Sequence, residues 1–345
     1  MPSVADDLVA VRRELGRPLR FDEYQQLALY GEHGFYTGGG QAGRRGDFIT
    51  SPEVGPLFGA VLARWIDGEF QRLGRPEDFR VVEVGAGPGT LARAVLAAAP
   101  RWTDRYTAVE LSPAQRALHP SGVVSTATLP DGPITGVVIA NELLDNVPFR
   151  LAVFDGTWRE AFVELDADGV ASEVTVAPPE EWSWLPTHAA HGARVPVQSA
   201  AADWVADVRG RLTAGTLLSV DYCTPRTAMV AAMPWREWLR TYRGHERGVH
   251  YLREPGTQDI TAQVCLDQLP EPDAVRTQAQ FLARWGIDEL VAEGVSVWTA
   301  NAARPDLHAL RMRSRVREAE SLLDPAGLGG FTAVEWSAQR TDPTR

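Results

Sequence analysis

The segment from Arg80 to Leu91 constrains the fold of this chain more than any other part of the sequence. A short run rich in valine leads into a turn with glycines at positions 85, 87 and 89, and a helix-like stretch continues to Ala99. Glycines between a strand and a helix let the backbone approach a ligand, and the start of the helix offers unpaired N–H donors. The pattern therefore predicts a ligand-binding turn at the end of a buried strand.

Three further short runs predict strands that each end in a polar residue. They cover residues 106–110, 136–141 and 216–221. Strands that alternate with helices and end in polar side chains are typical of an open α/β sheet with its site at the carboxyl ends of the strands. We therefore predict an α/β fold with a Rossmann-like sheet.

The composition excludes several classes of protein. Of 345 residues, 44% are hydrophobic and 23% are charged, which is ordinary for a globular chain and excludes global disorder. No run approaches the ~20 apolar residues of a membrane span. The net charge of −11 gives no global field for nucleic acid or anionic lipid. We therefore expect neither a nucleic-acid partner nor a membrane partner.

Three features of the sequence predict where the protein is located and whether it binds a metal. They are the cysteines, the histidines and the first 20 residues. Cys223 and Cys265 are too few for a disulfide framework, and the seven histidines show no metal-ligand spacing. Residues 1–20 contain an early acidic pair and no apolar core of a secretory signal. The expectation is a cytoplasmic protein without a metal site.

The remaining segments are assigned by periodicity and turn signals. Residues 151–165 read as a β-hairpin around an Asp-Gly turn, and residues 331–337 read as a final strand. The other predicted elements are helices, at about 22–33, 54–70, 261–269, 277–293 and 306–323.

Two cofactor classes compete for the glycine turn. The dinucleotide pattern G-x-G-x-x-G would require a third glycine at position 90, which is Thr90. The chain instead has E-x-G-x-G-x-G, with Glu83 inside the strand, and this resembles the first motif of class I S-adenosylmethionine (SAM) methyltransferases. Glu110 would accept from both ribose hydroxyls, but an acid at that position occurs in both classes. Thr90 is therefore the one feature of this turn that disfavours a nicotinamide oxidoreductase.

Six segments that occur in order resemble the MidA-type methyltransferase family, which includes the mitochondrial arginine methyltransferase that assists assembly of respiratory complex I. The resemblance runs from about Phe21 to Trp336. The segments are G-D-F-I-T-S-P-E at 46–53, V-E-V-G-A-G-P-G-T-L at 82–91, N-E-L-L-D-N-V-P at 141–148, W-R-E at 158–160, G-T-Q-D-I-T-A at 256–262 and T-Q-A-Q-F-L at 277–282.

This resemblance implies SAM as the cofactor. It also implies that the segment 46–53 folds over the cofactor, although Asp47, Thr50 and Ser51 could equally serve only to cap a helix. The residues expected to contact SAM are Gly85, Gly87, Gly89, Glu110, Asn141, Asp47, Thr50 and Ser51.

The resemblance also implies an arginine side chain of a protein as the methyl acceptor. Because the guanidinium pKa lies above ~12, carboxylates must orient the group and accept a proton. Glu142 and Asp145 follow the strand 136–141 and are three residues apart, so one helical turn would place both on the same side. The alternative is that Glu142 caps a helix and Asp145 faces solvent. Asp221 is a weaker candidate.

On the substrate side, Arg243, His245 and Asp259 are expected to line the same cleft. The predicted organisation is an N-terminal helical region, residues 1–78, that covers the cofactor site, followed by a SAM-binding domain, residues 79–345. The second region carries an insertion at about 150–200 and a substrate-side segment at about 222–300.

Two departures from the family pattern motivate a second hypothesis. Gln263 stands where relatives carry an ionisable group, and Cys265 stands where relatives carry an acid. The leading interpretation is a SAM-dependent methyltransferase that acts on a protein substrate. The alternative is a non-catalytic assembly or interaction protein that keeps the fold and binds SAM. The sequence leaves a homodimer open.

Overall fold

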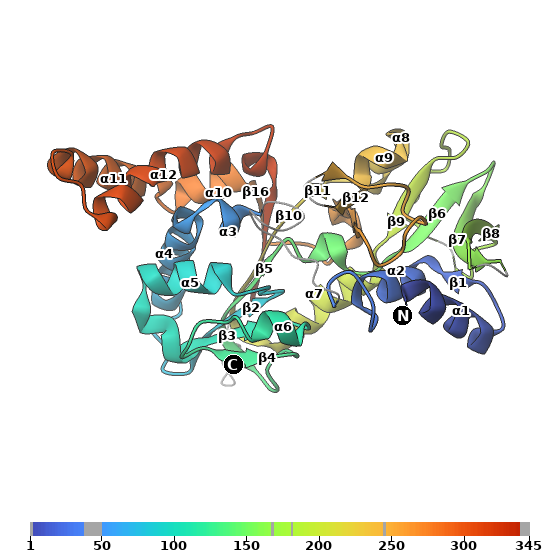
Figure 1. Ribbon diagram of the computed structural model, residues 1–345, viewed down its shortest axis with the longest axis horizontal. Helices are drawn as coiled ribbons and strands as arrows, with labels where there is room; N and C mark the ends of the chain where they lie inside the picture. Colours follow the sequence, from blue (N-terminus) through green and yellow to red (C-terminus); the bar gives the residue numbers. More distant parts are fainter. Residues whose placement is uncertain (1–2, 38–49, 167–168, 181, 244–245, 339–345) are drawn as a thin grey trace, which may run out of the picture. The chain divides into compact units, whose positions relative to one another are not determined.

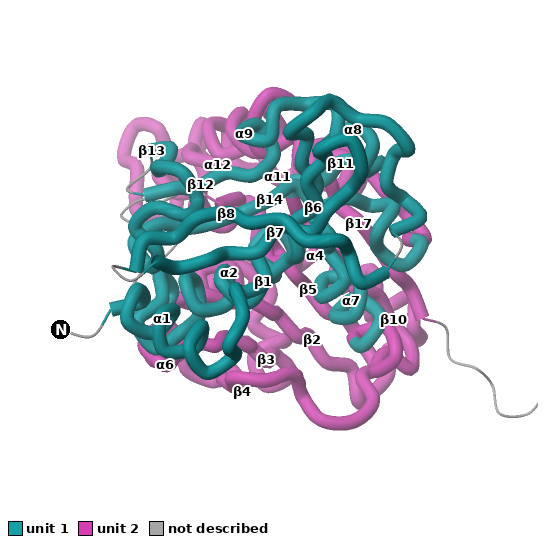
Figure 2. The backbone as a smooth tube through the Cα atoms, turned by 90° about the vertical axis from the view of Figure 1, so that its right-hand side faces the viewer, with its two compact units in different colours: residues 1–48, 144–207, 222–271 teal, residues 49–143, 208–221, 272–345 magenta. Residues whose placement is uncertain are grey.

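The computed structural model describes residues 3–37, 50–166, 169–180, 182–243 and 246–338. The chain divides into two compact units, which Figure 2 shows in different colours. Unit 1 comprises residues 1–48, 144–207 and 222–271, and unit 2 comprises residues 49–143, 208–221 and 272–345.

Unit 2 is built on a seven-stranded sheet in the order β16-β17-β10-β5-β2-β3-β4. Figure 1 labels β10, β5, β2, β3 and β4 of this sheet. The five strands from β10 to β4 are parallel, β17 is antiparallel to β10, and β16 is antiparallel to β17. The strands are β2 (Phe79–Val84), β3 (Tyr106–Val109), β4 (Val124–Thr126), β5 (Ile134–Asn141), β10 (Leu212–Asp221), β16 (Ala274–Thr277) and β17 (Thr332–Ala338).

The order of these strands contains a switch point between β2 and β5. The chain builds outward from β2 to β3 and β4 on one side, and from β5 to β10 on the other. In open α/β sheets, ligands bind outside the carboxyl ends of the strands at such a point. Both strands are almost fully buried, which fits their near-continuous apolar sequence.

The helices of unit 2 are α3 (Ser51–Val54), α4 (Pro56–Arg72), α5 (Thr90–Ala98), α6 (Pro113–Arg116), α10 (Gln278–Arg284), α11 (Ile287–Asn301) and α12 (Leu307–Leu323), with 3-10 turns η1 (Pro100–Arg105) and η4 (Leu328–Gly330). In unit 2, α5 and α6 alternate with the strands as the sequence predicts, whereas α3 and α4 precede β2 and the last three helices lie between β16 and β17. Large buried rings fill the core. Phe70, Phe79 and Trp102 lie with their ring centroids 5.1–5.2 Å apart, and Trp65 packs on Phe281.

Unit 1 contains an antiparallel sheet in the order β1-β7-β6-β9, with β8 paired to β7. Its strands are β1 (Leu19–Arg20), β6 (Arg150–Phe154), β7 (Trp158–Leu165), β8 (Ala171–Val176) and β9 (Arg194–Val197). The predicted hairpin is confirmed, because β6 pairs with β7 across the Asp155-Gly156 turn. The ring of Phe21 lies 5.3 Å from those of Phe149 and Tyr251 in the core.

Two smaller sheets complete unit 1. One pairs β11 (Cys223–Thr224) with β15 (Val264–Cys265), and the other joins β12 (Leu239–Arg243), β13 (Glu246–Arg247) and β14 (Asp259–Ala262). The helical elements are α1 (Val4–Leu15), α2 (Phe21–Tyr30), α8 (Thr227–Ala232), α9 (Trp235–Trp238) and the 3-10 turns η2 (Leu144–Asn146) and η3 (Leu266–Gln268). Helix α7 (Ser199–Arg211) is divided between the units in sequence: residues 199–207 belong to unit 1 and residues 208–211 to unit 2.

Two of the predicted helices are wrong in part. In the segment 261–269, residues 261–262 belong to β14 and 264–265 to β15, because they pair with β12 and β11, and η3 follows. The segment 277–293 is divided at Gly286, whose φ of +81° ends α10 and begins α11. The helix predicted at 54–70 is observed as α4, which begins at Pro56.

The compact units do not coincide with the predicted boundary at residue 78. The division falls after Phe48, and α4 belongs with the sheet of unit 2. The segment expected at 222–300 is divided at residue 271 between the two units. That residues 1–78 cover the cofactor stays a prediction. In the described part of the chain, no helix is both long and apolar enough to cross a membrane.

The centre of the large sheet predicts a sharp stability effect. Gly136 in β5 has φ +140°, and a Cβ there would lie 2.0 Å from the carbonyl oxygen of Arg80 in β2. We expect Gly136→Ala to lower the free energy of unfolding by about 3 kcal/mol or more, from backbone strain and overlap together. Urea unfolding checks this. Gly132→Ala is the control, because its φ is also positive at +81° but no atom lies within 4 Å. An equal loss in both variants would contradict the account.

Candidate functional site

The glycine turn lies at the switch point of the unit 2 sheet. It directly follows β2, and residue Val84 at the end of that strand pairs in register with Ala140 of β5. The carboxyl ends of β2 and β5 therefore bring the turn beside Asn141 and Glu142. The fold thus assembles the predicted cofactor residues of unit 2 at one edge of the sheet.

All three glycines of the turn adopt the left-handed conformation. Their φ angles are +70° at Gly85, +53° at Gly87 and +80° at Gly89. A Cβ at Gly85 would lie 3.0 Å from the side chain of Leu143, and one at Gly89 would lie 3.0 Å from Pro120. Residues with side chains rarely tolerate this backbone conformation, so the spacing of the glycines is a requirement of the turn itself.

Glu110 holds the turn from the end of β3. Its Oε2 accepts a hydrogen bond from the backbone N–H of Gly87 at 2.9 Å, and its Oε1 accepts from the N–H of Ser112 at 2.8 Å. Each carboxylate oxygen offers two lone pairs, so these bonds leave acceptor capacity for a diol. The carboxylate of Glu110 thus lies at the turn, as the sequence predicts, and its contact with ribose stays a prediction.

His119 and Arg93 fix the carbonyl groups of the turn. His119 Nε2 lies 2.9 Å from the carbonyl oxygen of Gly87, and because a carbonyl only accepts, this nitrogen carries the proton. Ser125 Oγ lies 2.8 Å from His119 Nδ1. Arg93 donates to the carbonyl oxygen of Pro88 at 2.8 Å. The backbone of the turn is therefore held on both sides before any ligand binds.

Beneath the turn, Glu83 is buried in β2 and accepts a hydrogen bond from the Tyr106 hydroxyl at 2.7 Å. Burial raises the pKa of Glu83 to about 8, although the hydrogen bond from Tyr106 acts in the opposite direction. Glu83 is therefore largely a neutral acid at pH 7. The acidic residue of the E-x-G-x-G-x-G motif lies within the protein interior.

Asn141 and Glu142 end β5 in a constrained geometry. Glu142 has φ +50°, which is uncommon for a residue with a side chain, and its backbone N–H donates to the carbonyl of Val220 at 2.8 Å. Glu142 Oε1 accepts from Asn141 Nδ2 at 3.1 Å and from the backbone N–H of Ser51 at 3.3 Å. Asn141 Oδ1 is buried and finds no partner among the described residues. Such an orphaned acceptor at a switch point is a feature of a ligand site.

Two expectations about this region are wrong. Glu142 and Asp145 do not share a helical turn, because Glu142 is left-handed and the 3-10 turn η2 begins only at Leu144.

The second concerns Ser51, which does not cap a helix with its side chain. It is the first residue of α3, and its hydroxyl donates to Gln278 Oε1 at 2.8 Å. Thr50 is the buried residue before α3 and makes no side-chain capping bond.

Asp145 and Asp259 belong to a buried polar cluster of unit 1. Asp259 Oδ1 accepts from the Tyr36 hydroxyl and from Asn146 Nδ2, both at 3.0 Å, while Asp145 Oδ2 accepts from the Thr261 hydroxyl. Both aspartates are less than 5% exposed, so the alternative that Asp145 faces solvent is wrong. Burial, reinforced by the charge of Asp259, raises the pKa of Tyr36 well above its usual value. Tyr36 is therefore a neutral donor.

The predicted substrate-side group is not brought together. Arg243 is exposed and forms an ion pair with Glu254 at 2.7 Å, whereas Asp259 is buried on the neighbouring strand β14. Successive side chains of a strand alternate between faces, and Tyr242 rather than Arg243 pairs with Asp259. His245 and Asp47 lie outside the described residues.

Sequence reasoning missed several residues that the structure places in these networks. Asn146, Thr261 and Gln278 lie inside segments that carry the family resemblance, so position within a motif was an available signal. His119 had none, because a lone histidine after a predicted strand has no recognisable spacing.

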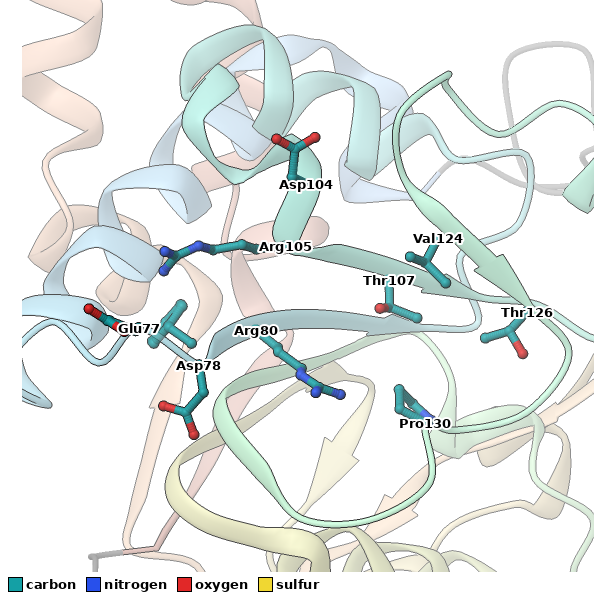
Figure 3. Close-up of a pocket in the computed structure, with 10 residues that line it drawn as sticks. Glu77, Asp78, Arg80, Asp104, Arg105, Thr107, Val124, Thr126 and Pro130 are labelled. Atoms are coloured by element: carbon teal, nitrogen blue, oxygen red, sulfur yellow. The ribbon is translucent and has the colours of Figure 1, made fainter.

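A surface pocket in unit 2 lies away from this edge. It has a volume of about 460 Å³, and Figure 3 shows its lining side chains, which include Glu77, Asp78, Arg80, Asp104 and Arg105. These residues lie at or before the starts of β2 and β3, so the pocket is at the amino-terminal edge of the parallel strands. The glycine turn lies at the opposite edge. Among the described residues, no group of three or more His, Cys, Asp or Glu side chains is arranged to hold a metal ion.

The fold and this edge define a class I SAM-dependent methyltransferase. The family model described as "Putative S-adenosyl-L-methionine-dependent methyltransferase" matches residues 61–282, and the chain belongs to that family. A crystal structure of a Burkholderia thailandensis protein bound to S-adenosyl-homocysteine superposes with a TM-score of 0.83 at 27% identity, and covers 98% of this chain and 92% of that one.

Curated relatives include proteins named protein arginine methyltransferase NDUFAF7. The Drosophila melanogaster homologue is 30% identical over 46% of this chain and 44% of its own length, and the Danio rerio protein is 25% identical over 79% and 74%. The chain thus spans less than half of the fly relative. Both are named as mitochondrial proteins.

The residues of unit 2 fit SAM, which is the cofactor of the family. The left-handed turn exposes its backbone to a ligand, Glu110 retains acceptor capacity for a ribose, and Asn141 presents a buried acceptor that has no partner in the part of the chain that the structure describes. The Thr90 position, where a dinucleotide turn would have glycine, begins α5.

The raised pKa of Glu83 predicts a dependence of stability on pH. An acid with a folded pKa of about 8 and an ordinary value of 4.5 stabilises the fold below pH 4.5, and this contribution is lost as the pH rises toward 8. The loss is at most about 1.4 kcal/mol per pH unit. We expect Glu83→Gln to flatten the profile, because glutamine stays neutral and still accepts from Tyr106. Unfolding between pH 5 and 9 measures this. Exposed Glu77→Gln is the control, and identical slopes for wild type and Glu83→Gln would contradict the assignment.

Proposed function

We propose that this chain methylates a nitrogen of an arginine side chain in a protein substrate, with SAM as the methyl donor. The observation that carries the proposal is the edge formed by the glycine turn, Glu110 and Asn141 in a chain of this methyltransferase family. The acceptor class is supported by the names of the curated relatives and by the carboxylate of Glu142 beside that edge.

The reaction moves a methyl group from sulfur to nitrogen. SAM supplies an electrophilic methyl on its sulfonium, so the S–CH₃ bond breaks as the N–CH₃ bond forms, and S-adenosyl-homocysteine and one proton are released. The protein's contribution is mainly positioning. A guanidinium is a poor nucleophile because its lone pair is delocalised and its pKa exceeds ~12, so a carboxylate that orients it and takes its proton assists the transfer.

Glu142 is the carboxylate that we assign to this task. Its left-handed backbone is held by Val220 of β10, and its side chain is held by Ser51 and Asn141. Strained residues that their surroundings over-determine often cluster at active sites. That Asp145 shares the task stays a prediction.

The non-catalytic alternative is not favoured. Gln263 donates through its backbone N–H to Trp238 and accepts from Gln198, and Cys265 donates through its N–H to the same Gln198 side chain. Burial raises the pKa of the Cys265 thiol to about 12. These hydrogen bonds use backbone groups of residues 263 and 265, so they do not depend on the two departures from the family pattern, and neither departure lies in the glycine turn.

The cellular context is proposed from the sequence. We propose the cytoplasm, as the sequence analysis expects, whereas the curated relatives are named as mitochondrial. A protein partner is required as substrate, and a homodimer remains part of the proposal to be measured.

Removal of Glu110 tests the cofactor assignment. Two charge-assisted hydrogen bonds to ribose are worth about 1.5–3 kcal/mol each. We therefore expect Glu110→Ala to weaken SAM binding by about 100-fold or more, measured by calorimetry. Glu77→Gln, at the other edge of the sheet, should bind as wild type does. A change below about threefold for Glu110→Ala would show that this carboxylate does not face the cofactor.

Glu142→Gln tests the chemistry separately from binding. The substitution keeps the Oε1 acceptor but removes the charge that pairs with a guanidinium. We expect SAM affinity to change little and methyl transfer to fall by about 100-fold or more, the scale for a positioned acid-base group. The assay transfers labelled methyl from SAM to lysate protein, followed by analysis for methylarginine. Label on another residue type would refute the arginine assignment, and equal loss of binding and transfer would make Glu142 a cofactor residue.

A further inference from the structure

A continuous series of hydrogen bonds, buried at Gln278 and part-buried at Glu142, runs through unit 2 from α12 to the end of β5. Gln278 Nε2 donates to the carbonyl oxygen of Leu322 at 3.1 Å, and Gln278 Oε1 accepts from the Ser51 hydroxyl at 2.8 Å. The backbone N–H of Ser51 donates to Glu142 Oε1, which also accepts from Asn141 Nδ2. We call these four residues, Gln278, Ser51, Glu142 and Asn141, the relay.

The direction of each bond in the relay follows from chemistry. A backbone carbonyl only accepts, so Gln278 must turn its NH₂ group to Leu322 and its oxygen to Ser51. Glu142 Oε1 already accepts from the backbone N–H of Ser51, so it presents an acceptor to Asn141 as well, and Asn141 turns its NH₂ group to it. The amide oxygen of Asn141 is then aimed away from Glu142. This is the buried atom that has no partner among the described residues.

Burial of two relay members limits the orientations that their polar groups can adopt. Gln278 and Ser51 are both fully buried, and the backbone N–H of Gln278 is anchored on the carbonyl of Phe331 at 2.6 Å. A reversed Gln278 amide would set its oxygen against the carbonyl of Leu322, and a reversed Asn141 amide would set its oxygen against the Glu142 carboxylate, and each such pair of acceptors is costly. Gln278 therefore holds the Ser51 side chain, the backbone N–H of Ser51 holds the Glu142 carboxylate, and that carboxylate sets the direction of the Asn141 amide.

We propose that Gln278, Ser51 and Glu142 are positioning residues that orient the Asn141 amide so that its oxygen accepts a hydrogen bond from an N–H or O–H group of the cofactor. This inference rests on the proposed binding of SAM at the glycine turn. The residues of the relay come from three motifs that are far apart in the sequence: Ser51 from the first, Asn141 and Glu142 from the second, and Gln278 from the third. The inference thus connects the motif at 277–282 with cofactor binding.

Removal of the opposing carboxylate tests the contact between two relay members. Asn141→Asp places a carboxylate oxygen against Glu142, and we expect S-adenosyl-homocysteine to bind at least about tenfold more weakly. The double variant Asn141→Asp/Glu142→Ala removes the carboxylate that opposes the new aspartate, and either aspartate oxygen can then accept from the cofactor. Its affinity should exceed that of Asn141→Asp by about threefold or more. A residue that only fills space would show no such rescue.

A second pair of variants separates positioning from the stability of α10. Gln278→Leu removes the start of the relay and should lower affinity about 3- to 10-fold. Gln280→Leu removes a bond of the cap of the same helix, between the backbone N–H of Thr277 and Gln280 Oε1, and should cost stability but not affinity. Calorimetry with S-adenosyl-homocysteine and thermal unfolding measure the two effects.

The outcomes distinguish this inference from the proposed function. A wild-type protein that does not bind S-adenosyl-homocysteine would overturn the cofactor assignment and the relay with it. A wild type that binds it, with a double variant no tighter than Asn141→Asp, would overturn the relay alone. Equal losses of affinity in Gln278→Leu and Gln280→Leu would also overturn the relay alone.

Discussion

The left-handed backbone of the turn after β2 is the constraint on which the site depends. Three glycines in five residues at φ between +53° and +80° allow the chain to leave a buried strand and start α5 at once. The turn then passes beside Glu110, whose carboxylate holds the N–H of Gly87. A side chain at any of these positions would add strain and fill space that a ligand needs. The rest of the sheet determines where this turn lies, between β2 and β5.

Around this turn, several polar groups of unit 2 are paired within the protein. The carbonyl of Gly87 is paired with His119, the carbonyl of Pro88 with Arg93, and Glu83 with Tyr106. Asn141 Oδ1 is instead buried without a partner among the described residues, and leaving such an acceptor unsatisfied costs about 1–3 kcal/mol. A ligand donor that pairs with it recovers that cost. The same logic explains why the relay behind Asn141 is built from groups with only one chemically allowed direction.

The sequence alone predicted those parts of the fold that depend on residues close together in the chain. The β2 turn, the strands that follow it and the hairpin at Asp155-Gly156 were predicted because valine runs, glycine spacing and turn residues act within a few positions. The strands at 259–265 were not, because their pairing with β11 and β12 is a tertiary contact that overrides a helical pattern. The composition of the units was missed for a similar reason, since unit 1 joins three segments that are far apart in the chain.

The residues of the candidate site divide in the same way, into those that local spacing predicts and those that only the tertiary structure places. Gly85, Gly87, Gly89 and Glu110 lie where the motif spacing places them, because a strand–turn–helix unit leaves little freedom. Glu142 could not be placed from spacing, because its left-handed φ interrupts the helical turn assumed for Glu142 and Asp145. Arg243 was grouped with Asp259, although Tyr242 is the residue opposite Asp259 and successive side chains of a strand alternate between faces. The role of Gln278 depends on a contact across 227 positions in the chain, which no local pattern shows.

The most direct test of the central claim is a crystal structure of this protein with S-adenosyl-homocysteine. The account predicts that both ribose hydroxyls lie within about 2.5–3.0 Å of the Glu110 carboxylate. It also predicts that the backbone of Gly85–Gly89 contacts the ligand and that a ligand donor is paired with Asn141 Oδ1. A ligand with its ribose away from Glu110, or one bound in the pocket at the amino-terminal edge of the sheet, would contradict it.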